Sequence, residues 1–151
     1  MIKKGFTLVE LMIVITVIAI LATIAVVTFT RVQKTARDSK RKEEMHSIVT
    51  ALQGYYSEKS VYPVSAVAAS ANTVLSPALT TNYMASVPVG PVGASGSNTD
   101  YMYVSGGSAN NQTFAICATL EVPTGSGSSM WKVDSQNLAG AEVADAPCTA
   151  P

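Results

Sequence analysis

The sequence is poor in the residues from which most catalytic and metal sites are built. Its 151 residues include one histidine, one tryptophan and two cysteines. The single histidine, His46, lies far along the chain from the serine-rich loops, which argues against a Ser-His-acid triad. No metal-ligand spacing, nucleotide-binding loop or nucleophile motif occurs. We therefore expect no enzymatic activity, no metal site and no cofactor.

Positive charge is nearly absent from the second part of the chain. Residues 60–151 contain one cation, Lys132, against five carboxylates, whereas residues 1–59 contain nine Lys or Arg against five. The two parts therefore carry net charges near −4 and +4. Polyanion binding needs clustered Lys and Arg, so we expect no specific nucleic-acid site in the distal part.

Proline is absent before Pro63, and the only glycine between Gly5 and that proline is Gly54. Residues 30–59 are rich in good helix formers. We therefore predict one helix from about Phe6 to Ser57, with no proline to kink it.

The segment of residues 6–29 has a single charge, Glu10, in 24 residues. As a helix it would be about 36 Å long, enough to cross a hydrocarbon layer of roughly 30 Å. Lys3 and Lys4 precede it and favour a cytoplasmic N-terminus. The segment is longer than the apolar run of a secretory signal peptide and has no A-x-A cleavage site at its end. We therefore expect a retained span in the cytoplasmic membrane.

The string KKGFTLVELMIVITVIAIL, residues 3–21, combines basic residues, Gly-Phe and a glutamate four residues after the phenylalanine. It resembles the prepilin signature of type IV pilins and the related pseudopilins. The resemblance implies a leader of residues 1–5, which a prepilin peptidase removes by cleaving between Gly5 and Phe6. It also implies N-methylation of the new amino group of Phe6.

A carboxylate within a membrane helix costs a few kcal/mol, so Glu10 is a candidate functional residue. One interpretation, supported by the resemblance, is that its carboxylate pairs with the amine of Phe6 on a neighbouring subunit during assembly. The alternative is a carboxylate that lies near the membrane surface or is protonated.

Residues 30–59 are predicted to be an amphipathic continuation of the helix. Met45, Ile48, Leu52 and Tyr55 recur at spacings of 3, 4 and 3, which places them on one face. The preceding stretch RVQKTARDSKRKEE is dense in cations. It is either a patch for lipid phosphates or DNA, or a solvated junction whose charges pair with acids on adjacent subunits. The interleaved carboxylates favour the second interpretation.

Residues 60–100 are expected to form a connecting αβ-loop with a short helix around Pro77 to Met84. Residues 101–151 are expected to form an antiparallel sheet and a C-terminal tail. Three strands are predicted, at Tyr101–Val104, Thr113–Leu120 and the MWKV segment. The apolar face of the helix, from Met45 to Tyr55, would cover one face of the sheet, with Phe114, Ile116 and Trp131 in the core. The other face of the sheet would stay open. The fold class is therefore α+β, similar to the type IV pilin fold.

Cys117 and Cys148 are the only cysteines. If the globular part lies outside the cytoplasm, they can form a disulfide that ties the tail to a strand. Closing a loop of about 30 residues would contribute roughly 3–4 kcal/mol. The alternative is a pair of free thiols in a reducing compartment.

The resemblance implies a structural subunit that polymerises into a type IV pilus on the cell surface, with the help of a pilus assembly machinery. A pseudopilin of a type II secretion or DNA-uptake apparatus shares the same N-terminus. Major pseudopilins carry an acidic calcium ligand near a Pro-Gly turn. The corresponding stretch here, SVPVGPVG, has none, so we expect no calcium site. A third possibility is a membrane-tethered binding domain that never assembles.

Overall fold

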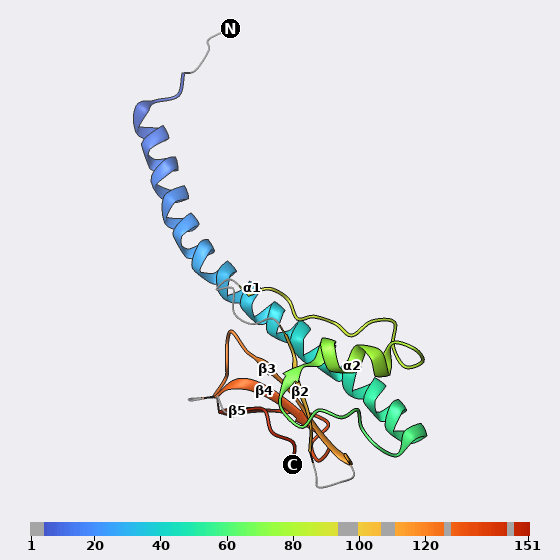
Figure 1. The fold of residues 1–151 in the computed structure, drawn as a ribbon. Coiled ribbons are helices and arrows are strands. Elements are labelled where there is room, and N and C mark those ends of the chain that lie inside the picture. The colour runs from blue at the N-terminus through green and yellow to red at the C-terminus, as the bar shows by residue number, and fades with distance from the viewer. Residues whose placement is uncertain (1–4, 94–99, 107–110, 126–127, 145–146) are drawn as a thin grey trace. The chain divides into compact units, whose positions relative to one another are not determined.

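The computed structural model describes residues 5–93, 100–106, 111–125, 128–144 and 147–151, with Val27 and Ser128 as backbone only. It has a long N-terminal helix and an antiparallel sheet, so the predicted α+β class is confirmed (Figure 1). The chain divides into two units, Met1–Gln33 and Lys34–Pro151, and each is described by itself. The elements are α1 (Leu8–Lys59), β1 (Ala69–Ser70), α2 (Ala71–Leu79), β2 (Met102–Gly106), β3 (Thr113–Thr119), β4 (Ser128–Asp134) and β5 (Ala141–Ala144).

Helix α1 runs through both units without a break, as the absence of proline predicts. It starts and ends within two residues of the expected bounds. The helix ends before Ser60, which adopts a left-handed conformation at φ 58°. The Ser60 backbone N–H donates to the Tyr56 carbonyl at 2.8 Å. The one glycine in the helix, Gly54, lies where the Tyr83 ring approaches. A Cβ there would be 3.2 Å from that ring.

The sheet is an antiparallel meander in the order β1-β2-β3-β4-β5. The three predicted strands correspond to β2, β3 and β4, but the sheet has five strands rather than three. The two missed strands lie at its edges. β1 has only two residues and exists through its pairing with β2, and β5 is an Ala-rich segment that pairs with β4. β1 has no β-branched or aromatic residue and β5 has one, Val143, so both lack the run of such residues on which strand prediction depends.

The main core lies between the sheet and residues 34–59 of α1. Met45, Ile48 and Leu52 are completely buried, and Tyr55 is half-buried against the same cluster. The sheet contributes Tyr103 from β2, Phe114 and Ile116 from β3, and Val133 from β4, with Trp131 partly buried beside them. Alternate residues of β3 thus face the helix, as the period of a strand requires. We call this cluster the helix-side core.

The opposite face of the sheet is not open, contrary to the expectation. Val104, Ala115, Cys117, Met130 and Cys148 form a second buried group there, the outer cluster. The cover comes from residues 147–151, the C-terminal tail, which lies on the side of the sheet away from α1 (Figure 1). The tail has no strand pattern, so its packing could not be inferred from local sequence.

Helix α2 lies earlier in the connecting segment than predicted. It covers Ala71–Leu79, so Pro77 lies within the helix, in its last turn, and not at its start. Its position follows from Ala71, Leu75 and Leu79, which recur every four residues and are fully buried. The buried apolar row therefore outweighed the tendency of proline to begin a helix.

Candidate functional site

The N-terminal end of α1 is held by a reciprocal pair of side chains. The Thr7 backbone N–H and hydroxyl both donate to Glu10 Oε2, at 2.9 and 2.7 Å, and the Glu10 N–H donates to Thr7 Oγ1 at 3.2 Å. This is a capping box, which satisfies backbone donors that a helix start leaves unpaired. The T-x-x-E spacing that produces it is visible in the sequence, but the sequence analysis missed it. Gly5, Phe6 and Thr7 precede the helix and are exposed.

The described residues of the first unit present an apolar surface, and within this part of the structure nothing packs on it. Its large apolar side chains are between 47% (Val14) and 79% (Phe6) exposed. The N-terminal part of α1 is long and apolar enough to cross a membrane, and none of the most apolar window is buried. Exposing so much apolar surface to water is unfavourable. This surface therefore requires an apolar environment, either lipid or other helices.

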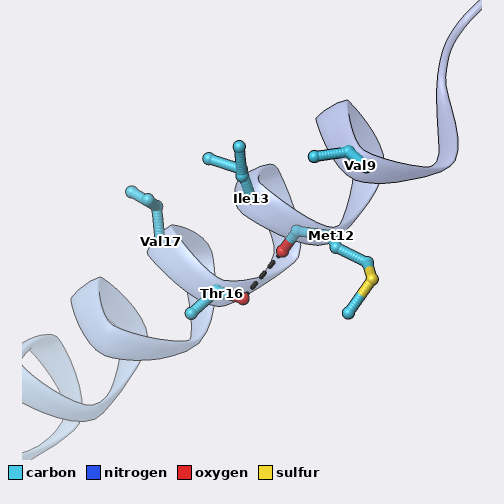
Figure 2. Close-up of a pocket in the computed structure, with 5 residues that line it drawn as sticks. All are labelled: Val9, Met12, Ile13, Thr16 and Val17. Carbon is cyan, nitrogen blue, oxygen red and sulfur yellow. Dashed lines mark hydrogen bonds between the residues drawn. The ribbon is translucent and has the colours of Figure 1, made fainter.

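Besides Thr7, four threonines lie within or directly after this apolar segment, and each of their hydroxyls bonds to the backbone of its own helix. Thr16 donates to the Met12 carbonyl at 2.7 Å (Figure 2). Thr23, Thr28 and Thr30 donate to the carbonyls of Ile20, Ile24 and Val26 at 2.7–3.1 Å. A buried hydroxyl without a partner is costly in an apolar medium. Because these four have partners, they can enter lipid or a helix bundle at little cost.

Shallow hollows on this segment contain no catalytic group. One is lined by Val9, Met12, Ile13, Thr16 and Val17, and Figure 2 shows the three β-branched aliphatic side chains along one side of the helix. A second is lined by Phe6, Thr7, Leu8 and Leu11. Surfaces rich in methyl groups are suited to packing against acyl chains or another helix, and not to chemistry.

In the second unit, the charged stretch binds its own domain. Arg37, Asp38 and Arg41 of α1 meet Glu121 in the loop after β3, and we call these four residues the junction cluster. Arg37 donates to both Glu121 oxygens at 2.7 Å, and Arg41 donates to Asp38 at 2.6 Å and to Glu121 at 3.0 Å. The hydrogen bond from Arg37 is the main cause that lowers the pKa of Glu121 to about 2.

Asp38 also anchors the loop backbone. Its carboxylate accepts the N–H of Glu121 at 3.0 Å and that of Val122 at 2.8 Å. Arg41 reaches the Pro91 carbonyl at 3.0 Å, so the cluster joins α1 to two loops. Arg37 and Arg41 are both paired with carboxylates of their own chain. The two arginines and the two carboxylates of the junction cluster therefore neutralise one another within the second unit.

The two cysteines are joined in the structure. The Cys117–Cys148 disulfide links β3 to the C-terminal tail across 31 residues of sequence. The Thr113 hydroxyl adds a hydrogen bond to the Pro151 carbonyl at 2.9 Å. His46 is exposed on α1. Among the described residues, no group of three or more His, Cys, Asp or Glu side chains is placed to hold a metal ion.

Parts of the chain are similar to known proteins. Residues 1–26 match the family model of the prokaryotic N-terminal methylation motif. The chain is 42% identical over 60 residues to the type IV major pilin protein PilA of Myxococcus xanthus (strain DK1622). This match covers 40% of the chain and 27% of the relative's length. No solved structure matches the chain significantly. The N-terminal residues thus carry a motif found in prepilins, and part of the chain is similar to a type IV major pilin.

Proposed function

We propose that this chain is the structural subunit of a type IV pilus filament. It is made as a precursor anchored in the cytoplasmic membrane by residues 6–29, with the N-terminus in the cytoplasm. A prepilin peptidase cleaves it between Gly5 and Phe6, and the amine of Phe6 is methylated. A pilus assembly machinery then moves the subunits into a homopolymer on the cell surface. The prepilin motif and the similarity to a major pilin support this proposal.

The observation that carries the proposal is the N-terminal part of α1. Its apolar side chains are exposed, and its threonine hydroxyls donate to backbone carbonyls of the same helix. Lipid and a bundle of like helices are both apolar, so moving the segment between them involves little change in solvation. The same segment can therefore be an anchor first and a filament core later. The second unit has its own buried core and can remain folded during the transfer.

Glu10 has a specific part in this scheme. Both hydrogen bonds from Thr7 to the Glu10 carboxylate end on Oε2, and among the described residues none ends on Oε1. Oε1 can therefore accept the amine of Phe6 from a neighbouring subunit while the capping box stays intact. The pairing would neutralise both charges in the apolar core and would set the axial offset between the two subunits.

The test is whether sheared cell-surface filaments contain this chain, beginning at a methylated Phe6, as their main component. Gly5→Val should block cleavage, so that the precursor accumulates in the membrane and filaments disappear. A Cβ at Gly5 would contact nothing within 4 Å, so such a loss could not be attributed to misfolding.

Glu10→Ala should leave a processed chain in the membrane without filaments. Thr16→Ala is the matched control in the same segment and should assemble normally. Normal filaments from the Gly5→Val or Glu10→Ala variants would refute the proposal. Loss of secretion or DNA uptake in cells that never display surface filaments would instead indicate a pseudopilin.

A further inference from the structure

The ion pairs of residues 34–151 leave few charged side chains for other partners. Nearly every cation of this unit is bound by a carboxylate of the same chain. The pairs are Arg37–Glu121, Arg41–Glu121, Arg41–Asp38, Lys40–Glu44, Lys42–Glu142, Lys59–Glu58 and Lys132–Asp134. Within the described part of this unit, Lys34 is the one Lys or Arg without such a pair, and Glu43 and Asp100 are the carboxylates without one.

Lys34 and Glu43 lie on opposite sides of α1. They are nine residues apart, which corresponds to about two and a half turns and an axial separation of about 13.5 Å. Lys34 is half-buried and begins the row that continues through Arg41 and Met45 under the domain. Glu43 is exposed on the other side, in the row of His46 and Thr50. One chain therefore cannot bring the two side chains together.

We propose that Lys34 of one copy binds Glu43 of the next copy in the filament. The proposal rests on the proposed function, because it needs neighbouring copies with roughly parallel helices. Complementary charges on opposite sides of one helix favour a heterologous contact, in which each copy offers its cation to one neighbour and its carboxylate to another. Contacts of this kind repeat without closing, as an open filament requires.

Glu43 is the better partner than Asp100 because it is exposed, whereas Asp100 is half-buried. Lys34 has no alternative at Asp38, one turn further along, because that carboxylate is taken by Arg41 and two backbone N–H groups. The pair sets an axial offset of about 13.5 Å between the two copies that share it. As a contact open to solvent, it weakens as ionic strength rises.

The direct test is zero-length cross-linking of native filaments with a water-soluble carbodiimide, which condenses a lysine amine with a carboxylate. We expect covalent dimers and longer ladders, and mass spectrometry should find the linking peptides joined at Lys34 and Glu43. Such a link must be intermolecular because the two groups are too far apart within one helix. Links from Lys34 only to Asp100, or none from Lys34, would overturn the pairing.

Charge reversal gives an independent test on cells with wild-type levels of membrane precursor. Lys34→Glu and Glu43→Lys should each reduce filament yield about tenfold or more, because like charges then meet at every repeat. The double reversal should restore most of the yield. Asp100→Asn and Lys59→Gln are controls and should assemble normally.

The outcomes separate this pair from the proposed function. Wild-type yield from both single reversals, or no rescue in the double variant, would overturn the pair while filaments still form. A wild-type chain that never enters filaments would remove the proposed function and this pair with it.

Discussion

Asp38→Ala tests how much the junction cluster contributes to the second unit. Asp38 is 5% exposed, and its carboxylate accepts hydrogen bonds from three donors: the N–H groups of Glu121 and Val122, and Arg41. Its removal would leave two loop N–H groups without their acceptor, at about 1 kcal/mol each, and would break one charged hydrogen bond worth about 1.5 kcal/mol. Arg41 keeps Glu121 and the Pro91 carbonyl, so its charge is not left alone. The expected loss is about 3–4 kcal/mol.

This loss would lower the melting temperature of a unit of this size by roughly 10–15 °C. The assay is thermal unfolding of the full chain in detergent, followed by the near-ultraviolet circular dichroism of Trp131, which packs on the helix-side core. Asp38→Asn keeps an acceptor oxygen but loses the charge, so it should show about half the effect. Asp100→Asn is the control. If Asp38→Ala melted within about 2 °C of that control, the cluster would not be a stabilising element.

Three further predictions concern the same unit. Because the pKa of Glu121 is lowered from 4.5 to about 2, its contribution to stability is complete above about pH 4.5 and is lost as the pH falls towards 2. The melting temperature should therefore decrease as the pH is lowered from 4.5 towards 2. In the Glu121→Gln variant, the melting temperature should depend less on pH in this range. A double Cys117→Ser, Cys148→Ser variant should lose roughly 3–4 kcal/mol in denaturant unfolding, and carboxypeptidase should then digest its tail. Gly140→Ala should be destabilised by more than about 1 kcal/mol, because Gly140 has φ +79° and its new Cβ would lie 2.6 Å from Trp131 Nε1; unchanged tryptophan fluorescence and stability would contradict this.

The elements that could be predicted from sequence are those with a strong local period. The long helix followed from the absence of proline, and its buried stripe from the spacing of Met45, Ile48 and Leu52. The alternation in β3 likewise follows from its own residues. The edge strands could not be predicted, because β1 and β5 are short and rich in alanine and depend on their neighbours.

The ion-pair partners of the charged stretch, residues 31–44, could not be predicted from the sequence either. Sequence reasoning placed its cations beside adjacent subunits or phosphates, but most of them bind carboxylates of their own chain. Arg37 and Glu121 are 84 residues apart, and no local pattern reports such a contact. The capping box at Thr7 and Glu10, by contrast, is a local signal and could have been found.

The sequence by itself determined the N-terminal segment, because length, hydropathy and the Gly-Phe-x-x-x-Glu spacing are properties of consecutive residues. Hydrogen bonding within a helix then satisfies its backbone and its threonines without any tertiary partner. Only the tertiary structure decided which charged side chains form ion pairs within the chain and which do not. It also decided which residues cover the outer face of the sheet. Those outcomes depend on side chains brought together from distant parts of the chain, by sheet register, by the loop after β3 and by the disulfide.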